Sequence, residues 1–178
     1  FLKFVHRLDA ETTGILLFAK SQGAVDSISE LFETRKMEKT YLAVVAGSPP
    51  QDEWTCRLKL GPAPGQIGRM TVDEFEGKEA ETHFRVLMSN ERFTLIEASP
   101  LTGRTHQIRM HLAESGSPIM CDELYGQVEK GFRLGLRAVR RNIEDRHDNV
   151  TRFLVVSRRE HEPTGRDTTE DIPSTAAK

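Results

Sequence analysis

One acidic side chain near the start of the chain, Asp9, stands where it could do chemistry. In HRLDAETTGILLFAK (residues 6–20) it lies two residues after Arg7, and Gly14 then begins an apolar run. We therefore expect Asp9 on a short loop at a sheet edge, where catalytic groups are often held. A nearby guanidinium would keep the carboxylate ionised, and a desolvated carboxylate can act as a nucleophile or a base. The alternative is a solvated turn residue that Arg7 neutralises.

A second group of polar side chains surrounds Gly103 in TGRTHQIRMH (residues 102–111). A helix that begins near Thr105 would present its N-terminal amides to an anion, and Arg109 would follow one turn later. The alternative is a capped helix with solvated arginines. We favour a functional cluster, whose candidate residues are Arg104, His106, Gln107, Ile108 and Arg109.

Tyr41, in the stretch EKTYLAVV (residues 38–45), has two interpretations. A strand aromatic usually belongs to the core. A tyrosine beside a polar site can instead be a platform on which a planar base stacks, and its phenol can take part in proton transfer. Both interpretations stay open at this point.

Metal binding is not indicated by the sequence. His106 and His111 are spaced for neither one helix face nor one strand face, and no acid cluster accompanies them. The two cysteines, Cys56 and Cys121, form no metal-type cluster either. We therefore expect no metal, and reduced thiols in a cytoplasmic protein.

The composition limits the kinds of partner. The 178 residues are 37% hydrophobic and 29% charged, which is typical of a globular domain rather than of a membrane or disordered protein. The formal net charge is −2, whereas proteins that coat nucleic acid usually carry a basic excess. Any nucleic-acid role must therefore depend on a local basic cleft.

Hydrophobic periodicity predicts five strands and two helices. The strands are expected over residues 14–19, 39–47, 54–60, 81–88 and 92–99, and the helices after an N-cap at Ser21 and from near Thr105 to Gly116. Several strands with few helices predict an α+β fold, with a mixed, largely antiparallel sheet and flanking helices.

Four stretches of the chain occur together in the order of one known family. They are HRLDAETTGILLFAK, KTYLAVVAG, GRMTVDEFEGKEAETHFRVL and LTGRTHQIRMHLAESGSPIMCDELYG. Through the motifs HRLD, K-x-Y-x-A and G-R-T-H-Q-I-R, residues 1 to about 127 resemble the RluA-type RNA pseudouridine synthases. The resemblance implies isomerisation of uridine to pseudouridine in ribosomal or transfer RNA, with no cofactor and no metal, by a protein expected to be monomeric.

The resemblance also implies roles for three catalytic residues. Asp9 matches the aspartate nucleophile that assists cleavage of the N-glycosidic bond. Tyr41 matches the tyrosine that stacks on the base and takes up a proton. Arg109 matches the arginine that pairs with the aspartate and keeps it charged.

The remaining candidate residues match positions that contact the RNA. The target base must leave the stack, so the enzyme needs a residue to fill the gap. Arg7 matches the residue that occupies this space. The positions expected to contact phosphate or ribose are Arg104, His106 and Gln107, and Ile108 is expected to line the base pocket.

The end of the chain differs in residue composition from the part that resembles the family. We expect the catalytic domain to occupy residues 1–128 and to lack N-terminal strands of the family. Residues 129–178 are expected to be a tail with one strand over 150–157 and disorder elsewhere. Residues 133–170 resemble the end of a prephenate dehydratase catalytic domain, whose TRF motif matches Thr151, Arg152 and Phe153. The alternative functions are therefore an inactive RNA-binding remnant and a fused or mis-joined fragment.

Overall fold

The computed structural model describes residues 1–128, 131–143 and 153–158, with residues 140–143 and 153–158 described by their backbone alone. The elements in chain order are β1 (Lys3–Phe4), β2 (Thr13–Ala19), α1 (Gln22–Glu33), β3 (Met37–Ala46), β4 (Glu53–Pro62), β5 (Met70–Val72), β6 (Lys78–Ser89), β7 (Phe93–Pro100), α2 (Gln107–Glu114), β8 (Leu136–Ile143) and β9 (Phe153–Arg158). All five predicted strands and both predicted helices are present, and the predicted α+β class is confirmed.

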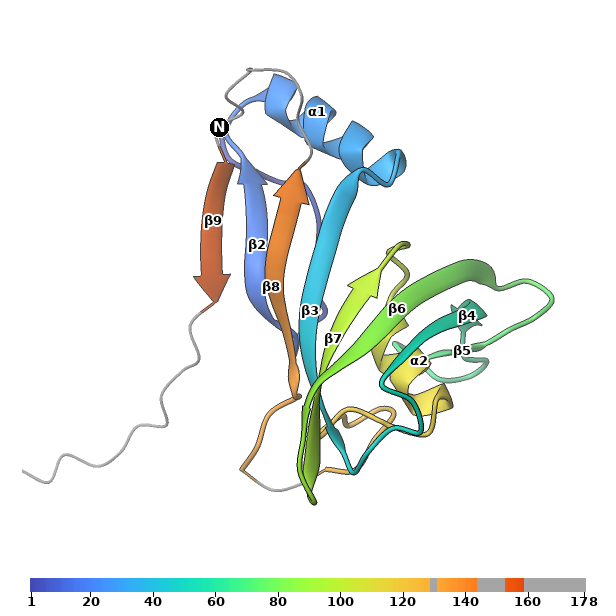
Figure 1. The fold of residues 1–178 in the computed structure, drawn as a ribbon. Coiled ribbons are helices and arrows are strands. Elements are labelled where there is room, and N and C mark those ends of the chain that lie inside the picture. Colours follow the sequence, from blue (N-terminus) through green and yellow to red (C-terminus); the bar gives the residue numbers. More distant parts are fainter. Residues whose placement is uncertain (129–130, 144–152, 159–178) are drawn as a thin grey trace, which may run out of the picture.

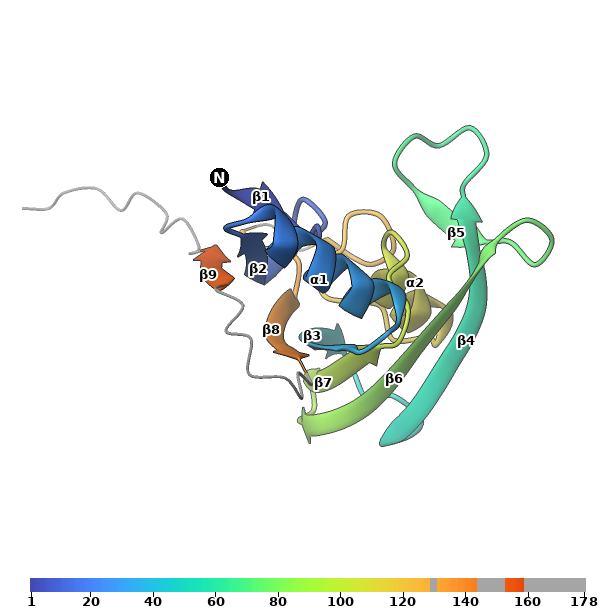
Figure 2. The ribbon, with the colours of Figure 1, turned by 90° about the horizontal axis from the view of Figure 1, so that it is seen from above.

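The strands of the described residues form one nine-stranded sheet. Their order is β1-β2-β8-β3-β7-β6-β4-β5, with β9 paired to β2 (Figure 1). The β2–β8 pair is parallel, and the other strand pairs are antiparallel. Figure 2 shows the sheet curving from β9 through β3 to β4, so that one face is concave. The prediction of a mixed, largely antiparallel sheet is therefore confirmed.

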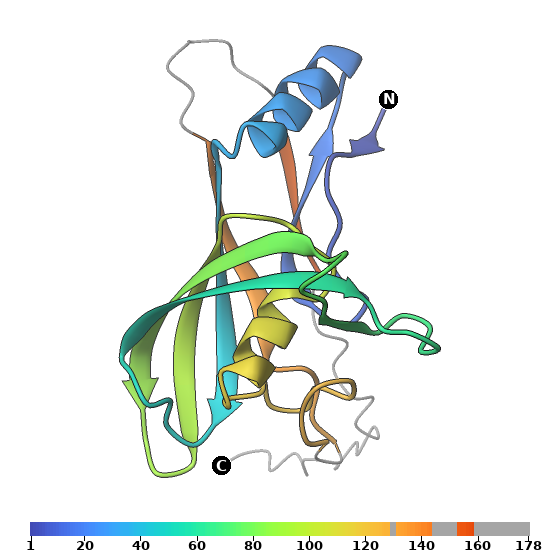
Figure 3. The same ribbon diagram turned by 90° about the vertical axis from the view of Figure 1, so that its right-hand side faces the viewer.

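The two helices cover different parts of the sheet. Ser21 caps α1 as predicted, because its Oγ accepts a hydrogen bond from the Ala24 amide at 3.2 Å. Helix α2 lies on the concave face against β4, β6 and β7 (Figure 3). It begins at Gln107 rather than near Thr105, since His106 has a left-handed backbone with φ of 54° and provides no side-chain cap.

Two apolar clusters form most of the core. The larger joins α2 to β3, β6, β7 and β8, and the smaller joins α1 to β2 and the start of β3. The larger contains Ala43, Val45, Phe84, Ile96, Ala98, Ile108, Leu112, Ile119, Leu134 and Leu136; the smaller contains Leu17, Ala19, Ala24, Ile28 and Met37. Together these clusters fix β2, β3 and α2 relative to one another.

The position of strand β8 differs from the domain boundary that we expected. We expected the domain to end near residue 128, but β8 lies between β2 and β3 in the middle of the sheet. Gly14 makes this contact possible, because a Cβ there would lie 2.1 Å from the Ala138 carbonyl oxygen and its φ is 113°. Residues 136–143 therefore belong to the sheet.

The expected strand over 150–157 is present as β9, which begins at Phe153 and pairs with β2. Thr151, Arg152 and the expected disorder of residues 159–178 lie outside the described residues.

Candidate active site

A pocket of about 240 Å³ lies where the two apolar clusters meet, between the segment before β2, strand β3 and the segment that leads into α2. Seven of the eight side chains singled out in the sequence line it, from three separate parts of the chain. They are Arg7, Asp9, Tyr41, Arg104, Gln107, Ile108 and Arg109. His106 is the eighth, and it does not line the pocket. The fold thus brings together Arg7 and Arg109, which are 102 positions apart in sequence.

The pocket lining carries more positive than negative charge. Arg7, Lys39, Arg104 and Arg109 are cationic, and Asp9 is the carboxylate among the lining residues. This excess of cations occurs in a chain whose formal net charge is −2. A concave site lined by cations attracts anions such as phosphate groups. The pocket is therefore a local basic cleft of the kind that a nucleic-acid role requires.

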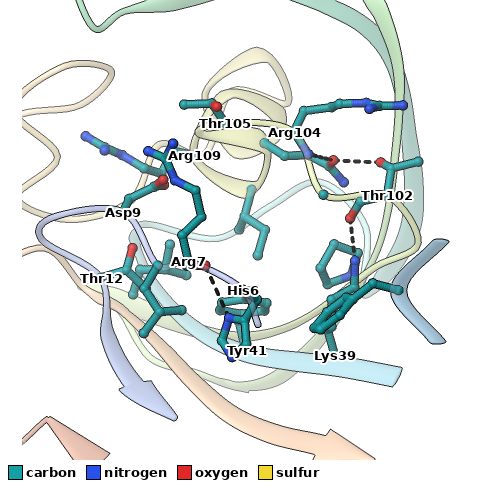
Figure 4. Close-up of a pocket in the computed structure, with 17 residues that line it drawn as sticks. His6, Arg7, Asp9, Thr12, Lys39, Tyr41, Thr102, Arg104, Thr105 and Arg109 are labelled. Carbon is teal, nitrogen blue, oxygen red and sulfur yellow. Dashed lines mark hydrogen bonds between the residues drawn. The ribbon is translucent and has the colours of Figure 1, made fainter. Parts of the chain in front are cut away.

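Asp9 projects from a tight turn immediately before β2. The Thr12 amide donates a hydrogen bond to the Asp9 carbonyl oxygen at 3.0 Å, and Gly14 then starts the close contact with β8. Figure 4 shows Asp9 beside Arg7 and Arg109 on one side of the pocket. The side chain of Asp9 is partly buried, whereas Arg7 is exposed. The carboxylate is thus held on a short turn at the pocket wall, as the sequence predicts for its backbone.

Arg109 is fixed by a carboxylate that sequence reasoning missed. Its Nε and one terminal nitrogen donate to the two carboxylate oxygens of Asp122 at 2.7 and 2.6 Å. The exposed fractions are 3% for Arg109 and 0% for Asp122, so this is a fully buried bidentate pair. Glu11 lies further away, at 3.9 Å from the guanidinium. We expected a direct pair with Asp9, but among the described residues the ion pairs of Arg109 go to Asp122 and Glu11.

Burial and the opposite charge of the partner shift the pKa values of Arg109 and Asp122 in opposite directions. Burial by itself would lower the pKa of Arg109, but the hydrogen bonds and charge of Asp122, together with the charges of Asp9 and Glu11, raise it. Burial would raise the pKa of Asp122, but Arg109 and two backbone amides lower it. Asp9 thus acts on Arg109 through its charge. A signal for Asp122 existed in the sequence, since CDELYG belongs to the fourth stretch that resembles the family.

Tyr41 packs on the core and also lines the pocket, so its role as a stacking platform stays a prediction. It lies on β3 opposite Ala98 of β7 and Ala138 of β8, at a shift in the β3–β8 register. Its partly buried ring packs against the larger apolar cluster and also lines the pocket. A ring held in this way offers a rigid apolar surface to a planar ligand.

Lys39 is a pocket residue that the sequence reasoning missed. It lies two residues before Tyr41 on β3, and residues two apart in a strand point to the same face. Its Nζ donates to the Thr102 carbonyl oxygen at 2.7 Å, which ties β3 to the segment before α2 (Figure 4). The period-two pattern around Tyr41 was therefore the signal that could have found it.

Gln107 is occupied by protein partners. Its Oε1 accepts from the Thr102 hydroxyl at 2.6 Å and from the Arg104 amide at 3.0 Å. Its Nε2 donates to the Glu81 carbonyl oxygen and to the Thr82 hydroxyl, both at 2.9 Å. Gln107 is only 4% exposed, so its amide holds the segment that carries Arg104 against β6.

His106 faces Tyr125 rather than the pocket. The Tyr125 hydroxyl accepts from the Met70 amide at 2.8 Å, and it lies 2.9 Å from Nδ1 of His106. Either atom can be the donor of this hydrogen bond, because the phenol oxygen can accept a second one. Burial lowers the pKa of His106, which favours the neutral imidazole.

The described residues contain no group of three or more His, Cys, Asp or Glu side chains placed to hold a metal ion. None of the helices in the described ranges is long and apolar enough to cross a membrane.

The chain is similar to proteins of known family. Residues 1–114 match the family model described as RNA pseudouridylate synthase. Ribosomal large subunit pseudouridine synthase C of Yersinia pestis is 43% identical over 135 residues, which are 72% of this chain and 41% of that protein. The protein of the same name from Haemophilus ducreyi is 38% identical over 159 residues, 86% of this chain and 48% of that protein. The chain thus spans less than half the length of these relatives.

Solved structures give the same fold. Human RNA pseudouridylate synthase domain containing 1 superposes with a TM-score of 0.74 at 28% identity, over 90% of this chain and 69% of that one. Human RNA pseudouridylate synthase domain containing 4 superposes with a TM-score of 0.69 at 24% identity, over 88% and 70%. None of the matches named here supports the resemblance of residues 133–170 to prephenate dehydratase, and we assign no such activity.

Proposed function

The chain belongs to the RNA pseudouridylate synthase family, and from this premise we propose that it isomerises uridine to pseudouridine in ribosomal or transfer RNA. The observation that carries the proposal is the convergence of Asp9, Tyr41 and Arg109 on one basic pocket. The names of its relatives, which specify the ribosomal large subunit, favour ribosomal RNA. No cofactor enters the proposed reaction, and the monomeric state and cytoplasmic location stay predictions.

The reaction breaks and makes equal numbers of bonds. The bond between ribose C1′ and uracil N1 breaks, the base turns, and C1′ bonds to C5 in its place. The proton on C5 leaves and N1 gains one, so nothing is oxidised or reduced. In our proposal Asp9 is the nucleophile that assists the first cleavage, and Tyr41 stacks on the base and takes up a proton.

Arg109 contributes charge in this scheme rather than a direct pair with Asp9. Asp122 holds its guanidinium in a fixed orientation before RNA binds. A positive charge that is already oriented stabilises negative charge at the reacting carboxylate without reorganisation. Ile108, at 6% exposure, supplies an apolar wall for the base.

Two cations of the pocket, Arg7 and Arg104, are proposed to contact the RNA. Arg7 is exposed at the pocket wall, which suits a side chain that enters the space left by a flipped base. Arg104 donates from Nε to the Glu79 carbonyl oxygen at 3.0 Å, which leaves its terminal nitrogens for phosphate. Gln107 and His106 hold this segment in place, so we revise their proposed role from RNA contact to support.

The position of a tritium label tests the reaction directly. Uridine-containing RNA labelled with tritium at C5 should release the label into water when the chain is added, because C5 loses its hydrogen. RNA labelled at C6 should keep its label, since that hydrogen takes no part, and this RNA is the control. RNA binding without release from C5 would favour the inactive remnant, and release from C6 would contradict the chemistry.

A further inference from the structure

The side-chain hydroxyl of Thr12 has an unusual environment for a polar group. Its side chain is 3% exposed, and its hydroxyl oxygen is buried with no hydrogen-bond partner among the described residues. A buried hydroxyl without a partner destabilises the protein, and native structures rarely keep one. The neighbouring Thr13 shows the usual situation, because its hydroxyl donates to the Leu136 carbonyl oxygen at 3.4 Å.

The unpartnered hydroxyl is part of the candidate active site. Thr12 lines the pocket with Asp9 and Tyr41, and its amide closes the turn on the Asp9 carbonyl oxygen at 3.0 Å. Figure 4 shows its hydroxyl oxygen pointing to the side of the pocket where Asp9 lies. A polar atom that lacks a partner in the free protein and faces a ligand pocket can obtain one from the ligand.

Building on the proposed function, we propose that the Thr12 hydroxyl is a substrate-binding group, which donates a hydrogen bond to a carbonyl of the bound uracil. The symmetry of uracil suits this role. Turning the ring about the axis through N3 and C6 exchanges N1 with C5, as the reaction requires, and it also exchanges the two carbonyl groups. A donor that faces one carbonyl before the turn therefore faces the other after it. The hydroxyl keeps its partner in both orientations.

Removing the hydroxyl should affect activity and stability in opposite directions. Thr12→Val keeps the shape of the side chain, so we expect kcat/KM for release of C5 tritium to fall about tenfold, the size of one hydrogen bond. The Tm should stay the same or rise, because the variant no longer buries an unpaired polar atom. Thr12→Ser keeps the hydroxyl and should stay within about threefold of the unmodified chain.

Thr13→Val is the matched control. It removes a hydroxyl that bonds the protein, one residue along the chain, so its Tm should fall slightly while kcat/KM stays within about twofold. Unchanged activity in Thr12→Val, or a lower Tm than that of Thr13→Val, would overturn the inference. An unmodified chain that releases no tritium would instead refute the proposed function itself.

Discussion

The two sides of the pocket hold their charges in different ways. On the side of α2, Arg109 is 3% exposed and is clamped by two short hydrogen bonds to Asp122. On the side of β2, Asp9 projects from a turn that a backbone bond to Thr12 closes, next to the exposed Arg7. The cation is thus set in the core, whereas the carboxylate lies on a surface turn.

This difference suggests different roles in the proposed reaction for the Arg109 side and the Asp9 side of the pocket. A preorganised cation reduces the reorganisation that the reaction needs. In the proposed reaction, Asp9 on its short turn can adjust to a flipped nucleoside as the RNA binds. Substitutions on the two sides should therefore separate stability from activity.

Breaking the buried pair should have the largest effect on stability. Asp122→Asn leaves Arg109 charged and buried without its counter-ion, so the free energy of unfolding should fall by about 3–5 kcal/mol. Urea denaturation measures this loss. The control is Glu81→Gln, which removes the Arg57–Glu81 pair at 2.7 Å from a largely exposed guanidinium and should lose less than about 1 kcal/mol. Similar losses in the two variants would contradict the comparison.

Gly14→Ala should have the next largest effect, on the Asp9 side. The new Cβ would lie 2.1 Å from the Ala138 carbonyl oxygen on a backbone with φ of 113°, so unfolding should become easier by about 2–3 kcal/mol. Gly23→Ala is the matched control, because it lies in α1 with no atom within 4 Å of the new Cβ. That variant should gain about 0.5–1 kcal/mol. A stable Gly14→Ala would show that β8 does not pack as described.

The smallest stability effect depends on pH and on His111. Burial lowers the pKa of this fully buried imidazole to about 4, from 6.5 in the unfolded chain. As the pH falls, the imidazole of the unfolded state binds a proton at a higher pH than that of the folded state. The contribution of His111 to the free energy of unfolding is therefore fully present above pH 6.5 and declines toward pH 4. Between pH 7 and pH 5 the loss should be about 2 kcal/mol.

Chemical denaturation of two variants at pH 7 and pH 5 tests this assignment. His111→Asn should lose most of the dependence, whereas His83→Asn, whose side chain is 39% exposed, should keep it. The same dependence in His111→Asn as in the unmodified chain would exclude His111 as its source.

Local patterns in the sequence predicted the elements that depend on interactions between residues close in sequence. Ser21 was found as a cap because a hydroxyl before an amphipathic run bonds the first free amides. The alternation of Trp54, Cys56 and Leu58 identified β4 because period two is specific to strands. Four motifs in family order predicted that Asp9, Tyr41 and Arg109 lie together, and all three line one pocket.

Long-range contacts were beyond these patterns. Strand β8 is rich in arginine, so its central place between β2 and β3 depends on a close approach at Gly14 that no local period encodes. Helix α2 begins at Gln107, two residues later than predicted, where a left-handed backbone at His106 accompanies the tertiary hydrogen bond from its side chain to Tyr125. Asp122 lies thirteen residues beyond Arg109, and only the folded chain shows that the two pair.

Pseudouridine formation by Asp9→Asn tests the central claim most directly. The substitution keeps the size of the side chain and removes its charge from the pocket wall, and Asp26→Asn, on the exposed face of α1, is the matched control. With RNA labelled at C5, we expect Asp9→Asn to release no tritium while its Tm stays near that of the unmodified chain, and Asp26→Asn to release it normally. Normal release by Asp9→Asn would contradict the account.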